Sequence, residues 1–247
     1  MYYIEDEEFG KVYVSMRAGM RNITMRWKGG SLYVNAPRSV SITQINSTLN
    51  KFRDKLRESR EKESITYNIG QVIQCYGLTL TIKEQDKKPS LILFKHCSDN
   101  VDVLVPKGID LNEPRNKNWI SKALRHALNG HTQPLIELAQ EVSRRLGVAP
   151  ARFEIGRGLR KMGHCTPNRV IQLSANLMFL PEDLIELTIC HELAHLTHMN
   201  HSPQFHALVD KYLNGREKLL ELKLKKFKWP VMWFLIGSLI SFSQIGH

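Results

Sequence analysis

Near its start the chain alternates apolar and polar residues with a period of two. The alternation runs through three segments, "KVYVSMR" (11–17), "RNITMRW" (21–27) and "SLYVNAP" (31–37). Gly29 and Gly30 supply a turn between the last two segments. Because this period places every second side chain on the same face of a strand, the pattern predicts a β-sheet with one buried face.

A charged amphipathic segment follows the strands. Its sequence is "QINSTLNKFRDKLRESREKE" (44–63), with apolar residues at helical spacing. Ser41 and Gln44 have the spacing of a capping box, which marks the beginning of a helix. The pattern therefore predicts one continuous helix.

The middle of the chain returns to short strand patterns and then becomes helical. Turn residues separate the strand candidates "QVIQCYG" (71–77), "LTLTIKE" (78–84), "SLILFK" (90–95) and "NVDVLVP" (100–106). From about residue 114 the apolar spacing predicts two consecutive helices, 116–130 and 134–147. The second helix should begin near Thr132 and Pro134 and end at Gly147.

Two further strand candidates lead into a last long helix. They are "RFEIGRG" (152–158) and "RVIQLSA" (169–175), and the helix begins at Pro181. The order of elements predicts an α+β protein. We expect a β-rich region over residues 1–110, a catalytic domain over 111–228 and an apolar tail over 229–247.

Composition and charge narrow the class of protein. The 247 residues are 42% hydrophobic, which is enough for a buried core. Lys and Arg exceed Asp and Glu by 35 to 24, and this balance favours acidic partners such as nucleic acid, anionic lipid or acidic peptides. A generally solvated basic surface is the simpler interpretation. The charge alone selects no partner.

The four cysteines are far apart in the sequence and form no CxxC pair. No signal peptide is recognisable at the amino terminus. The pattern argues against a disulfide framework and against a cysteine zinc site, and we expect a reducing, cytoplasmic location.

The last helix carries the candidate chemistry, in the segment "CHELAHLTHMNHSPQFHALV" (190–209). The helix should run to about His198. His191 and His195 are four residues apart, so their imidazoles project from the same side and can hold one Zn²⁺. In an HExxH segment the glutamate, here Glu192, does not bind the metal but takes a proton from water.

A catalytic zinc site needs a third protein ligand, for which His201 is the candidate. An unbroken helix would turn by roughly 280° between His191 and His201 and would point the latter away. The helix must therefore end between them. Asn200 tolerates the left-handed conformation of a helix end, and Ser202 with Pro203 is typical of the beginning of a new helix.

These residues carry a resemblance to a known family. "HELAHLTHMNHSPQF" (191–205) resembles the signature of the YgjP-like family of predicted zinc metallopeptidases, and "RKMGHCTPNRVIQLSANLMFLP" (160–181) and "NITMRWKGGSLYVNAP" (22–37) resemble other segments of it. The resemblance covers most of residues 10 to 215. It implies a zincin-like fold related to SprT-type and WLM-type proteases. It also implies ligand roles for His191, His195 and His201 and a catalytic role for Glu192.

The chain departs from the family pattern at four positions. Met162 stands where the family usually has Trp, His164 where it has Ser, Ser174 where it has Asn, and His206 where an aromatic residue often stands. Cys165 could be a nucleophile, but without a recognisable base a packed thiol is the better interpretation. His164, His198 and His206 could each stabilise an oxyanion or orient a ligand. A surface or supporting role is the simpler interpretation for each of the three.

Three functions agree with the sequence. The first is a zinc peptidase, with an extended peptide paired along the edge of the strand near residues 169 to 174. The second is a metal-dependent hydrolase of another electrophile such as a nucleotide phosphate, although no P-loop glycine pattern is present. The third is a non-catalytic zinc-stabilised module that binds nucleic acid. The retention of Glu192 argues against it, because structural sites normally have a fourth protein ligand.

The carboxyl-terminal segment poses a separate question. The basic segment "ELKLKKFK" (221–228) is followed by "WPVMWFLIGSLISF" (229–242). A membrane span needs about twenty apolar residues, so this run is too short for one. We favour a tail that docks on the core or is irregular over an interfacial membrane anchor with Trp229 and Trp233 at headgroup depth.

Overall fold

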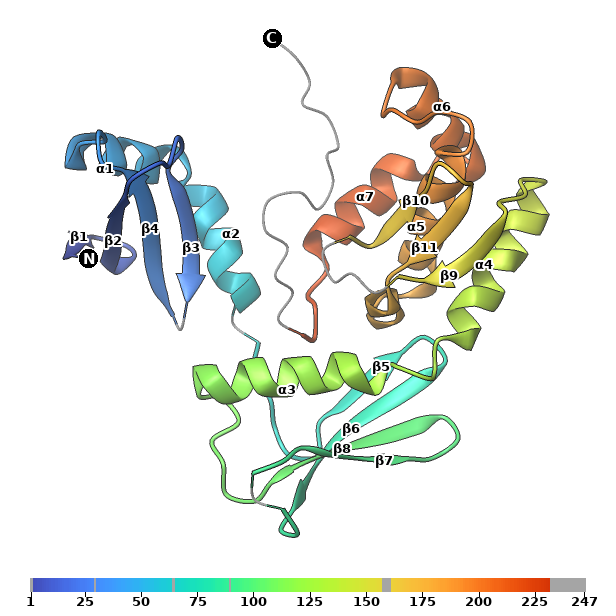
Figure 1. Ribbon diagram of the computed structural model, residues 1–247, viewed down its shortest axis with the longest axis horizontal. Helices are drawn as coiled ribbons and strands as arrows, with labels where there is room; N and C mark the ends of the chain where they lie inside the picture. The colour runs from blue at the N-terminus through green and yellow to red at the C-terminus, as the bar shows by residue number, and fades with distance from the viewer. Residues whose placement is uncertain (1, 29, 64, 89, 157–160, 232–247) are drawn as a thin grey trace. The chain divides into compact units, whose positions relative to one another are not determined.

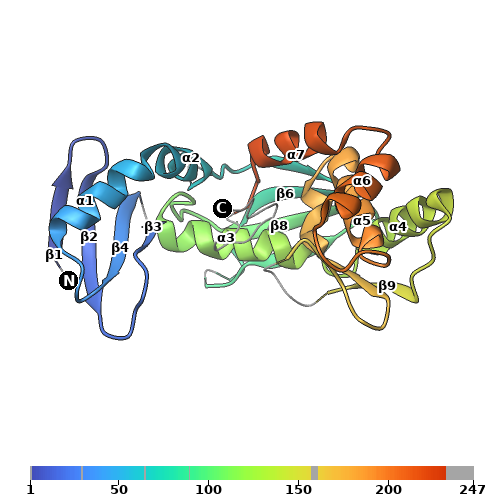
Figure 2. The same ribbon diagram turned by 90° about the horizontal axis from the view of Figure 1, so that it is seen from above.

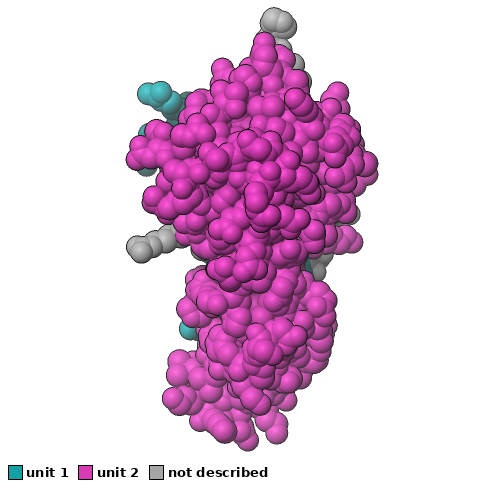
Figure 3. Space-filling view, turned by 90° about the vertical axis from the view of Figure 1, so that its right-hand side faces the viewer, with its two compact units in different colours: residues 1–66, 112–115 teal, residues 67–111, 116–247 magenta. Residues whose placement is uncertain are grey.

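The computed structural model describes residues 2–28, 30–63, 65–88, 90–156 and 161–231. The chain packs as two compact units (Figure 3). Unit 1 consists of residues 1–66 with 112–115, and unit 2 of residues 67–111 with 116–247. This division follows packing alone, so the functional boundary expected near residue 110 stays a prediction.

Unit 1 is built on a four-stranded sheet. Its strands are β1 (Tyr2–Asp6), β2 (Gly10–Arg17), β3 (Thr24–Lys28) and β4 (Ser31–Pro37), in the order β1-β2-β4-β3 (Figure 1). The pairing of β2 with β4 is parallel, and the other two pairings are antiparallel. The three alternating segments are strands, as predicted. The sequence did not predict β1, because its run "YYIED" has only one apolar residue between polar or aromatic ones.

Two helices cover the inner face of this sheet, where one was predicted. They are α1 (Ile42–Lys51) and α2 (Arg53–Glu63), so the expectation of a continuous helix is wrong. The chain departs from helical geometry at Phe52, with φ −108° and ψ 12°. The capping box is present: the Gln44 amide donates to Ser41 Oγ at 3.2 Å, and the Ser41 amide donates to Gln44 Oε1 at 2.9 Å.

Tertiary ion pairs coincide with the break between the two helices. Arg53 begins α2, and its guanidinium lies 2.8 Å from Asp6 Oδ2 and 3.0 Å from Glu8 Oε2. Arg57 also pairs with Glu8. Asp6 ends β1 and Glu8 lies in the turn that follows it, so these ion pairs are long-range contacts that a local pattern does not contain. The core of the unit lies between the helices and the sheet, formed by Val12, Val14, Trp27, Leu32, Val34, Ile45, Leu49 and Leu56 with their neighbours.

Unit 2 begins with a second four-stranded sheet. Its strands are β5 (Val72–Cys75), β6 (Leu78–Gln85), β7 (Leu93–His96) and β8 (Asn100–Pro106), in the order β5-β6-β8-β7. The helix α3 (Pro114–Ala127) lies along this sheet (Figures 1 and 2) and buries Ile120 and Leu124. All four strands overlap the segments predicted from the alternation.

A three-stranded sheet and four helices complete unit 2. The strands β9 (Arg152–Ile155), β10 (Gly163–Cys165) and β11 (Val170–Leu173) have the order β10-β11-β9. The helices are α4 (Gln133–Leu146), α5 (Glu182–Ala194), α6 (Pro203–Tyr212) and α7 (Glu217–Lys226), and a short 3₁₀ helix spans Ala175–Phe179. As predicted, α4 ends at Gly147, whose φ of 67° is the left-handed conformation that glycine adopts most readily. The mixture of helices and mixed sheets confirms the α+β class.

Candidate metal centre

The helix α5 is the central element of the candidate site. Glu182 and Asp183 lie in its first turn, where their negative charges favour the positive end of the helix dipole. The helix packs against α4, α6, α7 and the strands β10 and β11. Because α5 is covered on several sides, most of its residues are buried: Leu184, Ile185, Leu187, Thr188, Ile189, Cys190, Glu192, Leu193 and Ala194. Its last turn is thus held in one position by the surrounding core.

Two histidines project from the end of this helix. The ring centroids of His191 and His195 lie 4.9 Å apart, as their spacing in the sequence predicts. The helix ends at Ala194, four residues earlier than expected. His195 is the C-cap, and its φ of −64° and ψ of −18° are still helical. The side chain of His195 therefore points as it would on a continuing helix, to the same side as His191.

The chain then reverses and returns His201 to the same place. Nε2 of His201 lies 3.1 Å from Nε2 of His191. Ser202 caps α6 as predicted, since its hydroxyl accepts the Phe205 amide at 3.3 Å. The left-handed conformation expected for Asn200 is wrong: among the described non-glycine residues only Arg169 and Asn214 have positive φ. Because α5 already ends at Ala194, the connection to α6 is longer than expected. It reverses direction without a left-handed conformation at Asn200.

A phenylalanine supports all three imidazoles from one side. The Phe205 side chain is fully buried, and its ring centroid lies 4.9 Å from His191, 4.6 Å from His195 and 4.9 Å from His201. The sequence did not predict this role, although the position of Phe205 in the first turn of α6 favours it. The ring nitrogens of the three histidines lie within 4.8 Å of one another, so the structure brings together the three residues expected to hold a metal.

The donor set fits a zinc ion. Tetrahedral Zn–N bonds of about 2.0–2.1 Å place two ligand nitrogens about 3.3 Å apart, close to the 3.1 Å between His191 and His201. Nδ1 of His195 lies 3.0 Å from the His198 carbonyl oxygen. A carbonyl only accepts, so Nδ1 of His195 carries the proton and Nε2 keeps its lone pair for a metal. Burial, followed by the nearby His195 and His201, lowers the pKa of His191 to about 3, which favours the neutral form that binds metals.

Glu192 lies beside this cluster and is itself only 5% exposed. Its side chain packs against Gly163 of β10 so closely that a Cβ on the glycine would lie 2.5 Å from Glu192 Oε1. Burial raises the pKa of Glu192 to about 8, while a backbone hydrogen bond from Cys165 and the charge of Lys161 act in the opposite direction. A buried carboxyl group with this pKa can both take up and release a proton near neutral pH.

The comparison with protein families agrees with this geometry. A family model described as "YgjP-like, metallopeptidase domain" matches residues 21–226. The chain belongs to the YgjP-like family. The match contains the three clustered histidines and Glu192, and it identifies the protein as a metallohydrolase of the metallopeptidase kind. The comparisons with curated proteins and with solved structures each returned no match.

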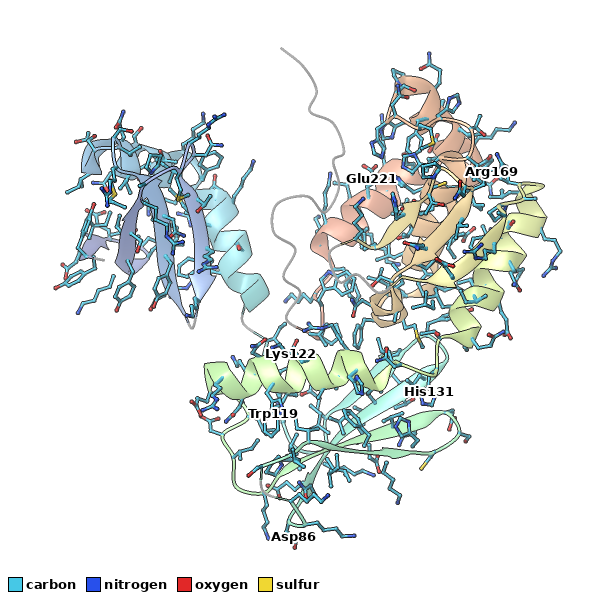
Figure 4. The ribbon with its side chains drawn as sticks, viewed as in Figure 1. Asp86, Trp119, Lys122, His131, Arg169 and Glu221 are labelled. Atoms are coloured by element: carbon cyan, nitrogen blue, oxygen red, sulfur yellow. The ribbon has the colours of Figure 1, made fainter. Side chains whose placement is uncertain are left out.

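The YgjP-like protein has a second group of candidate ligands close to the first. His206, Glu217 and Glu221 place one ligand atom each within 4.8 Å, and Figure 4 labels Glu221 on α7. Nδ1 of His206 lies 2.8 Å from Glu217 Oε1, and Glu217 is buried. The ring centroids of His206 and His201 are 6.3 Å apart. Neither glutamate was predicted from the sequence, although their spacing of four residues on a helix could have indicated a shared face.

Two other residues of the expected site lie on β10. Cys165 is buried, and burial followed by the charge of Glu192 raises the pKa of its thiol. The thiol form therefore predominates at neutral pH, in agreement with a packed rather than a nucleophilic cysteine. His164 is exposed, and burial of its ring followed by the charge of Lys161 lowers its pKa. The surface or supporting roles expected for His164, His198 and His206 stay predictions.

The strand expected to pair with a peptide is not an edge strand. Residues 170–173 form β11, which lies between β10 and β9 and pairs with both of them. The expectation of an edge at residues 169 to 174 is therefore wrong. The alternation of "RVIQLSA" predicts a strand but contains no information about its neighbours. Within the described residues, the strands at the two edges of this sheet are β9 and β10.

Most of the apolar tail, residues 232–247, lies outside the described residues. In the described part, the ring centroids of Phe227 and Trp229 lie 5.3 Å apart with the rings nearly perpendicular. Among the described residues, none of the helices has the length and apolar character needed to cross a bilayer. The choice between a docked tail and an interfacial anchor stays a prediction.

Proposed function

We propose that the YgjP-like protein is a zinc-dependent peptidase. His191, His195 and His201 would hold the zinc ion, and Glu192 would act as the general base. The observation that carries the proposal is the convergence of three imidazole nitrogens within 4.8 Å at the end of a helix that also carries a buried carboxyl group. Bound zinc supplies Lewis acidity, which makes water more acidic and polarises a carbonyl group.

The residues of the chain supply the remaining functions. His195 is fixed in the metal-binding tautomer by the His198 carbonyl, and Phe205 holds the three rings in place. Glu192 takes a proton from water during attack on the peptide carbonyl and later gives it to the leaving amine. A pKa near 8 suits both steps, and a cation held by the histidines would favour the carboxylate form that the first step requires.

We further infer where an extended substrate binds. Within the described residues β10 is paired on one side only, with β11, and its Gly163 contacts Glu192. A peptide added as a strand beside β10 would use the backbone groups on the other side of that strand. This arrangement brings a substrate carbonyl close to the proposed base. It replaces the pairing with residues 169 to 174 that the sequence suggested.

A pair of matched substitutions tests the proposal. Glu192→Gln is nearly isosteric and leaves the three histidines in place, so the protein should keep about one zinc per chain. Hydrolysis of a fluorescently labelled casein should fall by roughly 10²- to 10⁴-fold, because a positioned general base contributes that much. Glu182→Gln makes the same chemical change at an exposed position of α5 and serves as the control. His201→Ala should lower zinc content and hydrolysis together, with exposed His126→Ala as its control.

Two results would overturn the proposal. One is a Glu192→Gln protein that binds zinc and hydrolyses casein at the wild-type rate. The other is purified wild-type protein that contains no zinc by elemental analysis and takes up none on dialysis. Hydrolysis of nucleoside triphosphates but not of casein or peptides would support the same metal and base acting on a phosphate instead.

A further inference from the structure

The outer face of the unit 1 sheet is built differently from its inner face. The inner face packs on α1 and α2 with Val12, Leu32 and other apolar residues that are completely buried. On the outer face, the described strand residues are exposed or half-buried, except Pro37 at the end of β4, which is buried. None of the exposed or half-buried outward residues is aliphatic. The hydrophobic core therefore accounts for one face of the sheet and leaves the composition of the other unexplained.

Three tyrosines form a single row across this outer face. The strand registers place Tyr3 opposite Tyr13, Tyr13 opposite Tyr33, and Tyr33 opposite Arg26. We call Tyr3, Tyr13, Tyr33 and Arg26 the tyrosine row. It crosses all four strands, a distance of about 14 Å at a strand spacing of about 4.8 Å. The Tyr13 and Tyr33 rings are stacked, with centroids 5.0 Å apart and an interplanar angle of 17°.

Cations surround the tyrosine row. Lys11 Nζ lies 4.9 Å from the centre of the Tyr3 ring, and Lys28 Nζ lies 6.0 Å from that of Tyr33. The face carries one carboxylate, Glu5, among its described strand residues, and four exposed cations: Lys11, Arg17, Arg26 and Lys28. The remaining exposed or half-buried outward side chains are Ser, Thr and Asn, and the buried Pro37 lies opposite Arg17 at the end of β4. The sheet face is therefore positive and aromatic, with small polar groups between the rings.

Three carboxylates of unit 1 form ion pairs away from this face. Asp6 and Glu8 form ion pairs with Arg53, and Arg57 pairs with Glu8 and Asp54. Within the described part of the chain, no ion pair within 4.0 Å involves any of the four cations of the sheet face. Their charge is thus available to an anion from outside the unit.

We propose that the tyrosine row and the four cations of the sheet face bind single-stranded nucleic acid. Aromatic rings stack on unpaired bases whatever the base, and Lys and Arg beside them contact the phosphates. A row of about 14 Å has room for about two or three bases, as on other four-stranded sheets with exposed aromatic residues. In a duplex the faces of the bases are already stacked on one another, so the row selects single strands.

The composition of the face favours this ligand over two other anions. A bilayer surface would be recognised by cations together with aliphatic side chains that enter it, and no exposed or half-buried strand residue of the face is aliphatic. An acidic peptide would use the cations but would leave the stacked tyrosines without a function. The proposal concerns unit 1 alone and goes beyond the peptidase activity proposed for unit 2.

The test measures fluorescence anisotropy of the full-length protein with fluorescein-labelled 20-mers of deoxythymidine and of uridine. Tyr13→Thr with Tyr33→Thr keeps β-forming residues but removes both rings. We expect binding to weaken by about 10-fold or more, since stacking on each base contributes about 5- to 150-fold. Tyr13→Phe with Tyr33→Phe keeps the rings and should retain binding within about 3-fold. Thermal unfolding of each variant checks that the sheet remains folded.

A second pair of variants tests the charge. Arg26→Gln with Lys28→Gln removes two cations from the sheet face, and Lys51→Gln with Lys55→Gln removes two exposed cations from the helices of the same unit. The first pair should weaken binding and lower the slope of log K against log salt by about 1.4, the value for two phosphate contacts on a single strand. The control pair should change affinity by less than about 2-fold. The deoxythymidine and uridine probes show whether DNA or RNA is preferred.

Several outcomes would overturn the proposal. Wild-type protein that binds neither oligonucleotide at 50 mM salt would do so, as would an equal loss of binding in the sheet-face and helix variants. Unchanged binding after loss of both rings would assign the interaction to charge alone. Binding to phosphatidylserine vesicles without binding to oligonucleotides would assign the face to a membrane. Glu192→Gln should bind oligonucleotides like the wild type, so failure of the peptidase proposal is distinguishable from failure of this one.

Discussion

The contact between Gly163 and Glu192 makes a sharp test of the site, because one methyl group should displace the proposed base. In Gly163→Ala the added Cβ would lie 2.5 Å from both Cγ and Oε1 of Glu192 and 2.8 Å from Cδ. Ordinary contacts of a Cβ begin at 3.4 Å, so the carboxyl group or the strand must move by about 0.9 Å. Glu192 is buried on a helix packed on several sides, so the movement is not free.

The expected effect is large on catalysis and moderate on stability. A displacement of about 1 Å at a reacting group can cost about 10²-fold in rate, so we expect kcat/KM to fall by that amount or more. Insertion of a methyl group into a packed region destabilises a protein by about 1–3 kcal/mol. Zinc content should stay near one per chain, because the three atoms nearest to the added Cβ all belong to Glu192 and none to a histidine.

Casein hydrolysis, zinc content and urea unfolding are measured for Gly163→Ala and for two controls. Gly156→Ala makes the same change in the same sheet, where the new Cβ would meet Gln172 Cβ at 3.4 Å, and should leave all three measurements near wild type. In a Glu192→Ala background the clash is absent. Gly163→Ala should then cost little stability, which gives a coupling of about 1–3 kcal/mol between the two positions.

Full activity in Gly163→Ala with zinc bound would refute the reasoning. It would show that Glu192 reaches its working position without the space beside β10, or that another group is the base. A loss of zinc together with activity would show instead that the substitution disturbs the three histidines. The loss of activity could then not be assigned to displacement of Glu192.

Three further substitutions have predicted effects. Asp6→Asn should cost about 1–2 kcal/mol at pH 7 after allowance for solvent screening, because Arg53 lowers the pKa of Asp6 from 3.8 to about 2. Since the folded pKa is the lower one, this stability is present above about pH 4 and lost as the pH falls to 2, so urea unfolding of the two proteins should converge there. Ser202→Ala removes the α6 cap, and it should cost about 1 kcal/mol and weaken zinc retention. Ser41→Ala, at the α1 cap, should cost a similar amount without changing zinc content.

Local chemistry in the sequence predicted well that the three histidines lie close together. The spacing of His191 and His195 depends only on helical geometry, and the return of His201 depends on a break that Ser202 and Pro203 mark. The end of α4 at Gly147 was predicted on the same kind of signal. In each case the residues that determine the local structure lie within a few positions of it. A short sequence pattern is therefore enough to predict it.

Features that depend on contacts between distant segments could not be predicted in this way. Gly163 adjoins Glu192 only because β10 packs on α5, and β10 has three residues, too few for a pattern. The pairing of His206 with Glu217 joins two helices across a turn. The central position of β11 is a property of the sheet and not of the strand. These are the contacts around the proposed base, so the sequence predicts the approach of the three histidines better than their surroundings.

The pairing of β2 with β4 has a practical consequence for anyone who produces this domain. The family match begins at residue 21, after β2, yet β2 lies between β1 and β4 and contributes Val12 and Val14 to the core. A protein trimmed to the matched region would lose β1 and β2. The backbone of β4 would be uncovered, and a cavity would remain where Val12 and Val14 had packed. Exposed strand edges of this kind pair with other chains. Expression boundaries set from the family match would therefore yield aggregating protein, and a start at or before β1 is needed to obtain the folded unit.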